Sequence, residues 1–263
     1  NANKLLARFL YSMSIKHEIA LVEIDGGNLR NAIPRAAHAV FGIDGARKED
    51  VRIAFNLFAA EIENEYSGLE PNLKLDLQSV DRPEYSIDYN TSINIIRSLY
   101  SAPHGVISMS RDLEGLVETS TNLASVKMLD GEKVLVTTSQ RSSVESRKWD
   151  IARQVEALFS MAGAEVSHGD GYPGWAPNLN SPIMKIAADA YEELYGIRPA
   201  IKAIHAGLEC GLFLEKNPGL DMVSFGPTLR DVHSPTERMH IPAVERFWGQ
   251  LCRTLEKVAD LKA

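Results

Sequence analysis

The chain contains little of what several protein classes depend on. Cysteine occurs only twice in 263 residues, at Cys210 and Cys252, which indicates a reducing compartment and not a disulfide framework. No apolar run reaches the roughly 18 residues that a transmembrane helix needs, and no basic and apolar signal peptide opens the chain. Acidic residues outnumber basic ones, 35 against 28, so we expect neither nucleic acid nor an anionic membrane as a partner.

Other absences concern chemistry and the start of the chain. No Walker loop, dinucleotide fingerprint or Cys-x-x-Cys pair occurs, so the sequence carries none of these nucleotide or redox signatures. The chain opens on Asn1 and not on methionine, and we expect its first residues to mark a boundary. What is present is ordinary for a globular protein: 44% hydrophobic and 24% charged residues, in a length that suits one large domain or two ordinary ones.

Apolar periodicity predicts helices and strands in the first 80 residues. Leucine, phenylalanine and methionine recur at helical spacing near the start of the chain. In the segment that follows, apolar and polar residues alternate, as in a strand. The predicted elements are a helix at 2–14, strands at 19–24 and 36–43, a helix at 48–66 and a strand at 73–80. The last three make a βαβ-like unit.

A second unit of the same kind follows a helix expected at 92–102. The Asp130-Gly131 pair is a strong hairpin signal between two apolar segments. The unit consists of strands at 124–129 and 133–139, a helix at 143–162 and a strand at 164–168. Together the two units predict a small sheet with helices on one face, which is an α+β fold.

A cluster of Gly, Pro, Asn and Ser at 171–182 is the best candidate for a domain boundary. Beyond it the pattern predicts a helix at 182–195, short buried strands at 200–204 and 221–225, and a terminal amphipathic helix at 243–262. These elements are typical of the closing part of an α/β domain.

Two turns after the expected short strands carry candidate site residues. His233 follows the second strand and precedes Ser-Pro; a neutral imidazole on a loop is the commonest metal ligand, and Pro235 stiffens this one. The segment HAGLECGLF, from His205, follows the first strand, and its glycines would let a substrate approach the backbone. From the residues alone, a structural histidine and a plain tight turn remain the alternatives.

The motifs HAGLECGLF, SFGP and HSPTE together resemble the aminoacyl-histidine dipeptidase family, dizinc peptidases of the aminoacylase/carboxypeptidase clan. The segments NANKLLARFL at the start of the chain, GGNLRNAIP at 26–34 and GYPGWAPNLNSPIMK at 171–185 extend the resemblance over nearly the whole chain. It implies an α+β lid and dimerisation domain at 1–172, lacking its first strand, and the C-terminal segment of an α/β zinc-peptidase catalytic domain at 173–263.

The resemblance also implies roles for particular residues. It makes His233 a metal ligand and places Gly207, Leu208 and Glu209 in a turn that binds the substrate carboxylate. The general base and most metal ligands would precede Asn1, so no catalytic residue is expected in this chain.

From the lid, the resemblance implies that Asn31 and Arg141 bind substrate. Arg can hold a carboxylate through two parallel hydrogen bonds. A turn-forming Asn before Pro34 and a solvated Arg are the alternatives. Cys210 is expected to be a small hydrophobe and not a nucleophile.

The function implied by the resemblance is hydrolysis of dipeptides with a C-terminal histidine by an enzyme holding two zinc ions, with cobalt or manganese as substitutes. A cytoplasmic homodimer formed through the lid and a small peptide substrate are expected, and this chain alone is expected to be inactive. Two alternatives stay open: another amidohydrolase of the clan, such as a tripeptidase or an aminoacylase, and a non-catalytic lid and dimerisation module. HAGLEC, in place of the Gly-Gly-Thr type of turn, favours the dipeptidase.

Overall fold

The computed structural model divides the chain into two compact units. It describes residues 1–111, 113–130, 133–169, 171, 173–175, 178, 180–202, 209–232 and 236–260. Unit 1 comprises Asn1–Ser108, Thr119–Gln140 and Ser146–Gly169, and unit 2 comprises Met109–Glu118, Arg141–Glu145 and Asp170–Ala263. The assignment of 1–172 to a lid and of 173–263 to part of a catalytic domain stays a prediction.

Five strands form the principal sheet, in the order β2-β1-β4-β3, with β5 also paired to β4. Strands β1 (Ala20–Gly26) and β2 (Ala37–Gly42) are antiparallel, with a bulge between Leu21 and Glu23. The others are β3 (Gly105–Met109), β4 (Val117–Leu129) and β5 (Lys133–Ser142). The expected pairing across Asp130 is confirmed, with Asp130 in the left-handed conformation at φ 51°.

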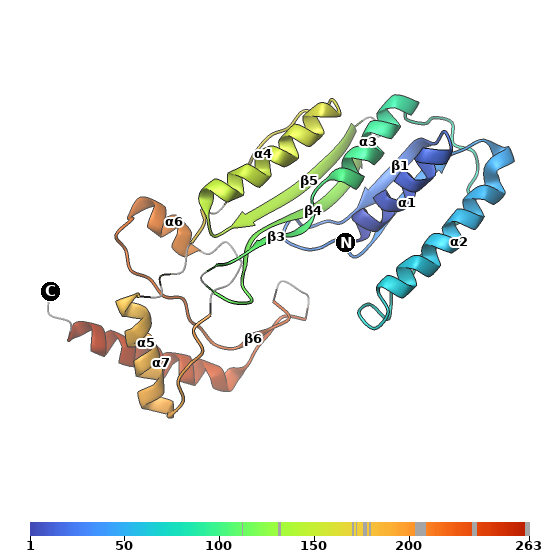
Figure 1. Cartoon of the computed structure of the whole chain (residues 1–263). Coiled ribbons are helices and arrows are strands. Elements are labelled where there is room, and N and C mark those ends of the chain that lie inside the picture. Colours follow the sequence, from blue (N-terminus) through green and yellow to red (C-terminus); the bar gives the residue numbers. More distant parts are fainter. Residues whose placement is uncertain are drawn as a thin grey trace. The chain divides into compact units, whose positions relative to one another are not determined.

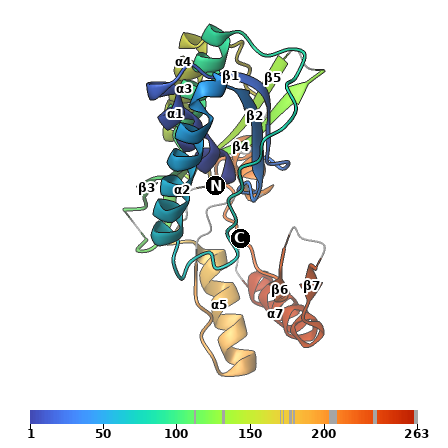
Figure 2. The same cartoon turned by 90° about the vertical axis from the view of Figure 1, so that its right-hand side faces the viewer.

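Four helices lie on one face of this sheet (Figures 1 and 2). They are α1 (Ala2–Lys16), α2 (Lys48–Glu65, preceded by the 3-10 turn Gly45–Arg47), α3 (Tyr89–Ser101) and α4 (Glu145–Met161). Side chains cap two of them: Asn1 accepts from the Lys4 amide and Asp88 from the Thr91 amide. The expected α+β class, with helices on one face, is confirmed.

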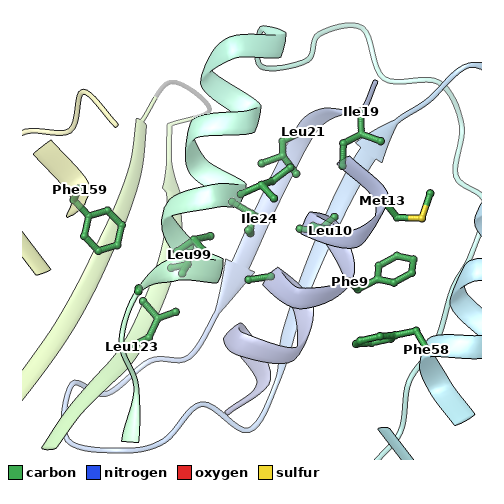
Figure 3. Packing of buried hydrophobic residues seen from close by; sticks show 14 of the residues in the cluster. Phe9, Leu10, Met13, Ile19, Leu21, Ile24, Phe58, Leu99, Leu123 and Phe159 are labelled. Atoms are coloured by element: carbon green, nitrogen blue, oxygen red, sulfur yellow. The ribbon is translucent and has the colours of Figure 1, made fainter. Parts of the chain in front are cut away.

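The core of unit 1 lies between the helices and the sheet (Figure 3). Phe9 of α1 is its aromatic centre, with ring centroids 5.6 Å from Phe55 and 5.3 Å from Phe58 on α2, and 6.5 Å from Phe41 on β2. Each large apolar side chain buried here contributes about 1.5–3 kcal/mol. The aromatic cluster therefore joins α1, α2 and the sheet into one packed body.

The strand expected at 73–80 is wrong. Its alternation is real, because Leu73, Leu75 and Leu77 pack against the core, yet the segment pairs with no strand. The chain returns to the sheet after this segment, where the Ile87 amide donates to the Leu21 carbonyl of β1. The first βαβ-like unit is therefore an antiparallel hairpin followed by a helix.

The strand expected at 164–168 is also absent, and that segment is irregular after α4. Conversely, β3 was not predicted from the sequence and is present. Both differences arise because a strand is defined by its ladder partner, which alternation in one segment cannot identify.

Unit 2 contains a pair of packed helices, a short helix and a two-stranded hairpin. Its elements are α5 (Pro182–Tyr195), α6 (Glu209–Lys216), β6 (Leu229–Arg230), β7 (Arg238–Met239) and α7 (Ile241–Ala259). The predictions of α5 and of the terminal helix are confirmed, whereas α6 was missed.

The short buried strands expected in this unit are not confirmed. Residues 221–225 are irregular, which contradicts the second of them. Residues 200–202 of the first are irregular too, and 203–204 lie outside the described residues. Within the part of the chain that the structure describes, no helix is long and apolar enough to cross a membrane.

Candidate functional site

The predicted site residues fall in three parts of the chain. Gly207 and Leu208, just before α6, and His233, between β6 and β7, lie outside the described residues. The others are described: Asn31 is in unit 1, and Arg141 and Glu209 are in unit 2.

The loop that carries Asn31 connects β1 to β2 and is closely tied to the sheet at its start. Gly27 adopts φ +69°, and a Cβ there would lie 2.0 Å from the Ala124 carbonyl oxygen, so only glycine fits. The Gly27 amide donates to the Ala36 carbonyl at 3.2 Å, which closes the two ends of the loop on each other. Asn31 itself is exposed at the far end of this loop.

The Asn31 side chain has no hydrogen-bond partner among the described residues. A second backbone bond, from the Ala2 amide to the Pro34 carbonyl at 3.0 Å, fixes the loop against the start of α1. Pro34 is buried by this contact. A free carboxamide on an anchored loop can donate to and accept from a ligand without first breaking an internal bond.

Arg141 lies inside β5 and not beyond its end, because the strand continues to Ser142. Its side chain is half-buried and has an interaction partner in the protein. Just after it, the Ser143 amide donates to the Glu118 carbonyl at 3.1 Å, so the backbone is held at this point. The planar guanidinium of Arg141, on a strand with a fixed backbone, can bind a carboxylate through two parallel hydrogen bonds. To do so, it must exchange its present interaction partner for the ligand.

Two glycines bring the end of β5 and the start of α6 against the same segment. A Cβ on Gly174 would lie 2.8 Å from the Ser143 carbonyl oxygen, and one on Gly211 would lie 2.6 Å from the Pro173 carbonyl oxygen. The Gly174 amide also donates to the Glu145 carboxylate at 3.0 Å. The sequence indicated this segment as a domain boundary and as a family motif, and it did not predict these close contacts, for which the glycines were the available signal.

Glu209 begins α6 and is exposed, where a carboxylate suits the N-terminus of a helix. Next to it, partial burial raises the pKa of the Cys210 thiol, and the Glu209 charge adds to this. A raised pKa reduces the fraction of thiolate, so the expectation that Cys210 is not a nucleophile agrees with its surroundings.

A cavity of about 520 Å³ lies in unit 2 beside the β6–β7 hairpin. Its lining includes Arg230 and Arg238, one on each strand, and Arg246 on α7, together with Tyr191. Asp231, which has φ 52°, pairs with Arg238 at 3.3 Å. The cavity lining thus contains three guanidinium groups, and one of them is paired with Asp231.

The described residues do not form a metal site. Among them no three His, Cys, Asp or Glu side chains lie together. A single histidine cannot build a closed zinc site, and His233 is the one metal ligand that the sequence suggested. At least some donors for the expected zinc would therefore come from outside the described part of the chain.

Comparison with known proteins gives three matches. Residues 1–70 match the family model described as peptidase dimerisation domain. The chain is 38% identical over 258 residues to the cytosol non-specific dipeptidase of Escherichia coli (strain K12), which covers 98% of this chain and 53% of that protein. The crystal structure of aminoacylhistidine dipeptidase from Vibrio alginolyticus superimposes with a TM-score of 0.85 at 37% identity, over 98% of this chain and 52% of that one.

The extent of these matches decides what they mean. At such identity over nearly all of its residues, the chain shares its fold and ancestry with both relatives, and it spans about half the length of each. The chain is therefore similar over nearly all of its residues to about half of each of these two dipeptidases, and its residues 1–70 match a peptidase dimerisation domain.

Proposed function

We propose that a protein containing this chain is a metal-dependent dipeptidase that cleaves dipeptides, preferentially those with a C-terminal histidine. The observation that carries the proposal is similarity over 98% of the chain to two proteins that are both named as dipeptidases. The two names differ in specificity, one being non-specific and the other naming aminoacylhistidine. The preference for histidine therefore needs its own test.

In this proposal the chain supplies substrate contacts and one metal ligand. Asn31 and Arg141 bind the peptide, and the turn at Gly207, Leu208 and Glu209 receives its carboxylate. His233 is the metal ligand. The enzyme would hold two zinc ions, which cobalt or manganese could replace, with the remaining ligands and the general base supplied outside this chain.

The protein would act as a cytoplasmic homodimer. The dimer is supported by the description of the family that matches residues 1–70, and the location by the name of the cytosol dipeptidase. A small peptide is the only substrate class that this proposal requires.

The test is a substrate panel assayed on a protein of the relatives' full length and on the 263-residue chain. We expect the longer protein to hydrolyse dipeptides, and aminoacyl-histidine substrates fastest, while the chain alone has no activity. Faster cleavage of tripeptides or N-acyl amino acids would identify another amidohydrolase of the clan. Robust dipeptide turnover by the 263-residue chain with bound zinc would contradict the assignment of the catalytic residues to another segment.

The role of His233 is tested by His233→Ala in the longer protein. Losing one ligand should strongly reduce both activity and bound metal while exposing few apolar groups. His38→Ala is the control, since His38 is exposed and lies 3.0 Å from Glu23 on the neighbouring strand. Full turnover with two metal ions retained would rule out His233 as a ligand.

A further inference from the structure

A carboxamide on β4 reaches the middle of the loop that carries Asn31. The Asn122 Nδ2 donates to the carbonyl oxygen of Ala32, the residue after Asn31, at 2.8 Å. The Asn122 Oδ1 accepts from the Nδ2 of Asn1 at 3.4 Å. The Asn122 carboxamide therefore uses its donor toward the loop and its acceptor toward the start of α1.

Asn1 is itself held from several sides. Its Nδ2 donates to the Leu123 carbonyl at 3.0 Å and lies 3.3 Å from the Nδ1 of His104. Its Oδ1 accepts from the Lys4 amide and so caps α1. Burial lowers the pKa of the His104 imidazole, and the positive charge of Lys4 lowers it further. The ring is thus neutral near pH 7, as an acceptor nitrogen must be.

These contacts connect His104, Asn1 and Asn122 to the Ala32 carbonyl, with the two hydrogens of the Asn1 Nδ2 shared among three acceptors. The backbone bonds of Gly27 and Pro34 hold the ends of the loop, but its middle is exposed. The bond from Asn122 is a side-chain hydrogen bond between the sheet and that middle. This hydrogen bond fixes the orientation of the peptide unit next to Asn31. It thereby also fixes the path of the backbone at Asn31.

We propose that Asn122 is a positioning residue, which holds the Asn31 loop in the geometry that binds the dipeptide substrate. The inference rests on the proposed function, because it takes Asn31 to contact substrate. Asn122 does not itself touch the substrate; it lowers the cost of ordering the loop when the substrate binds. Asn122 is only half-buried, so replacing it should alter binding more than folding.

The experiment compares Asn122→Ala, Asn122→Asp, Asn31→Ala and the double variant Asn31→Ala/Asn122→Ala in the full-length dipeptidase. Aspartate keeps the shape of Asn122 but places a charged oxygen against the Ala32 carbonyl, so it removes the donor and adds a repulsion. Both Asn122 variants should raise KM about 2- to 10-fold, as expected for one lost hydrogen bond, with kcat and the thermal midpoint nearly unchanged. The double variant should be no worse than Asn31→Ala, because Asn122 acts through Asn31.

Asn94→Ala is the matched control, since Asn94 is exposed on α3 and its side chain has no partner among the described residues. Unchanged KM in both Asn122 variants, beside a raised KM in Asn31→Ala, would overturn the inference and leave the proposed function intact. Additive effects of Asn31→Ala and Asn122→Ala, or a neutral Asn31→Ala, would overturn it too.

A wild-type protein without dipeptidase activity would refute the proposed function instead. Hydrogen exchange of the 263-residue chain then decides the structural part of the inference. Asn122→Ala should speed exchange of the amides at 29–33 while leaving β1 and β2 protected. Equal exchange rates of these amides in wild type and variant would contradict the positioning role of Asn122.

Discussion

Ion pairs between α5 and α7 make the stability of unit 2 depend on pH. Glu193 on α5 accepts from Arg253 at 2.5 Å and from Lys257 at 2.7 Å, both on α7. These two hydrogen bonds hold the pKa of Glu193 at about 2, well below its ordinary 4.5. Because the folded-state pKa is the lower one, this carboxylate stabilises the fold above pH 4.5, and the contribution is lost as the pH falls toward 2.

We predict that Glu193→Gln lowers the melting temperature at pH 7 by a small amount, since the pair is solvent-exposed. The gap between wild type and variant should shrink as the pH falls below 4.5. Melting curves from pH 7 to pH 3 measure it, with Glu245→Gln on the exposed side of α7 as the control. A gap that widens on acidification would contradict the assigned pairing.

A second prediction at the residue scale concerns Arg141. If its guanidinium binds the substrate carboxylate, Arg141→Lys in the longer protein should raise KM, because an ammonium cannot reproduce the planar two-bond geometry. The expected loss is about 1.5–3 kcal/mol, which is roughly tenfold or more in kcat/KM. A dipeptide amide, which lacks the carboxylate, should be affected much less. Equal effects on dipeptide and amide would show that Arg141 does not bind the carboxylate.

At the scale of elements, the position of α6 depends on the absence of one side chain. A Cβ on Gly211 would lie 2.6 Å from the Pro173 carbonyl oxygen. Because this oxygen belongs to the backbone, it cannot move away by a side-chain rotation. Alanine favours a helix over glycine by about 1 kcal/mol, whereas overpacking of this kind costs about 1–3 kcal/mol. The steric cost should therefore prevail.

We predict that Gly211→Ala destabilises unit 2 despite its better helix propensity. Urea unfolding should show a lower midpoint for the variant than for wild type. Gly219→Ala is the control, since a Cβ there meets nothing within 4 Å. A midpoint for Gly211→Ala that equals or exceeds that of wild type would mean that α6 is not held against Pro173.

At the scale of the whole molecule, two helices carry apolar residues that the chain itself does not bury. On α2, Ile53 and Leu57 are 60% and 64% exposed, and with Ala60 they form a stripe opposite the buried Phe58 and Ile62. A surface helix normally needs only one apolar stripe. The second stripe lies within the 70 residues that match a dimerisation domain, so we expect it to contact a second copy of the chain.

The prediction is that Ile53→Glu/Leu57→Glu converts a dimer into a monomer, as measured by sedimentation at several concentrations. At protein concentrations below the dimer dissociation constant, wild type is also monomeric. The melting temperature of the variant, followed by circular dichroism, should then be close to that of wild type, because both side chains are already exposed in the monomer. Ile107→Glu tests pairing through the edge strand β3, where Ile107 is exposed. Dissociation by this variant, and not by the α2 variant, would assign the dimer to strand pairing.

On α7, the face turned toward α5 is polar and the apolar face is exposed. Gln250 is buried and donates to the Ala187 carbonyl at 3.2 Å, and Thr254 is buried beside it. Ile241 and Trp248, on the opposite side, are 80% and 63% exposed. Since the relatives are about twice as long as this chain, we expect their additional segment to cover this face.

We therefore predict that Trp248→Lys leaves the melting temperature of the 263-residue chain unchanged but destabilises a protein of the relatives' length. The expected loss in the longer protein is about 3–5 kcal/mol, the range for truncating a buried aromatic residue. Tryptophan fluorescence should shift to shorter wavelength in the longer protein, and Glu245→Lys on the same helix is the control. Equal stability of the longer protein with and without the substitution would show that Trp248 stays exposed.

The sequence by itself determined the elements whose signals are local. Helix α5 occupies the predicted residues because Ser181 caps the Met184 amide, Pro182 begins the helix and Gly196 ends it at φ 69°. The motifs likewise indicated the resemblance to dipeptidases without any structure, and the role of Asn31, which rests on its motif, stays a prediction. For His233, Gly207 and Leu208, the sequence remains the only basis, because these residues lie outside the described part of the chain.

Only the tertiary structure decided which segments pair and which glycines and amides are indispensable. The alternation at 73–80 is compatible with a strand, but the leucines pack against the core without a ladder. The contacts of Gly211 with Pro173 and of Asn122 with Ala32 join residues 38 and 90 positions apart. Caps and periodicity act within a few residues, whereas strand pairing and close packing depend on partners that distant parts of the chain supply.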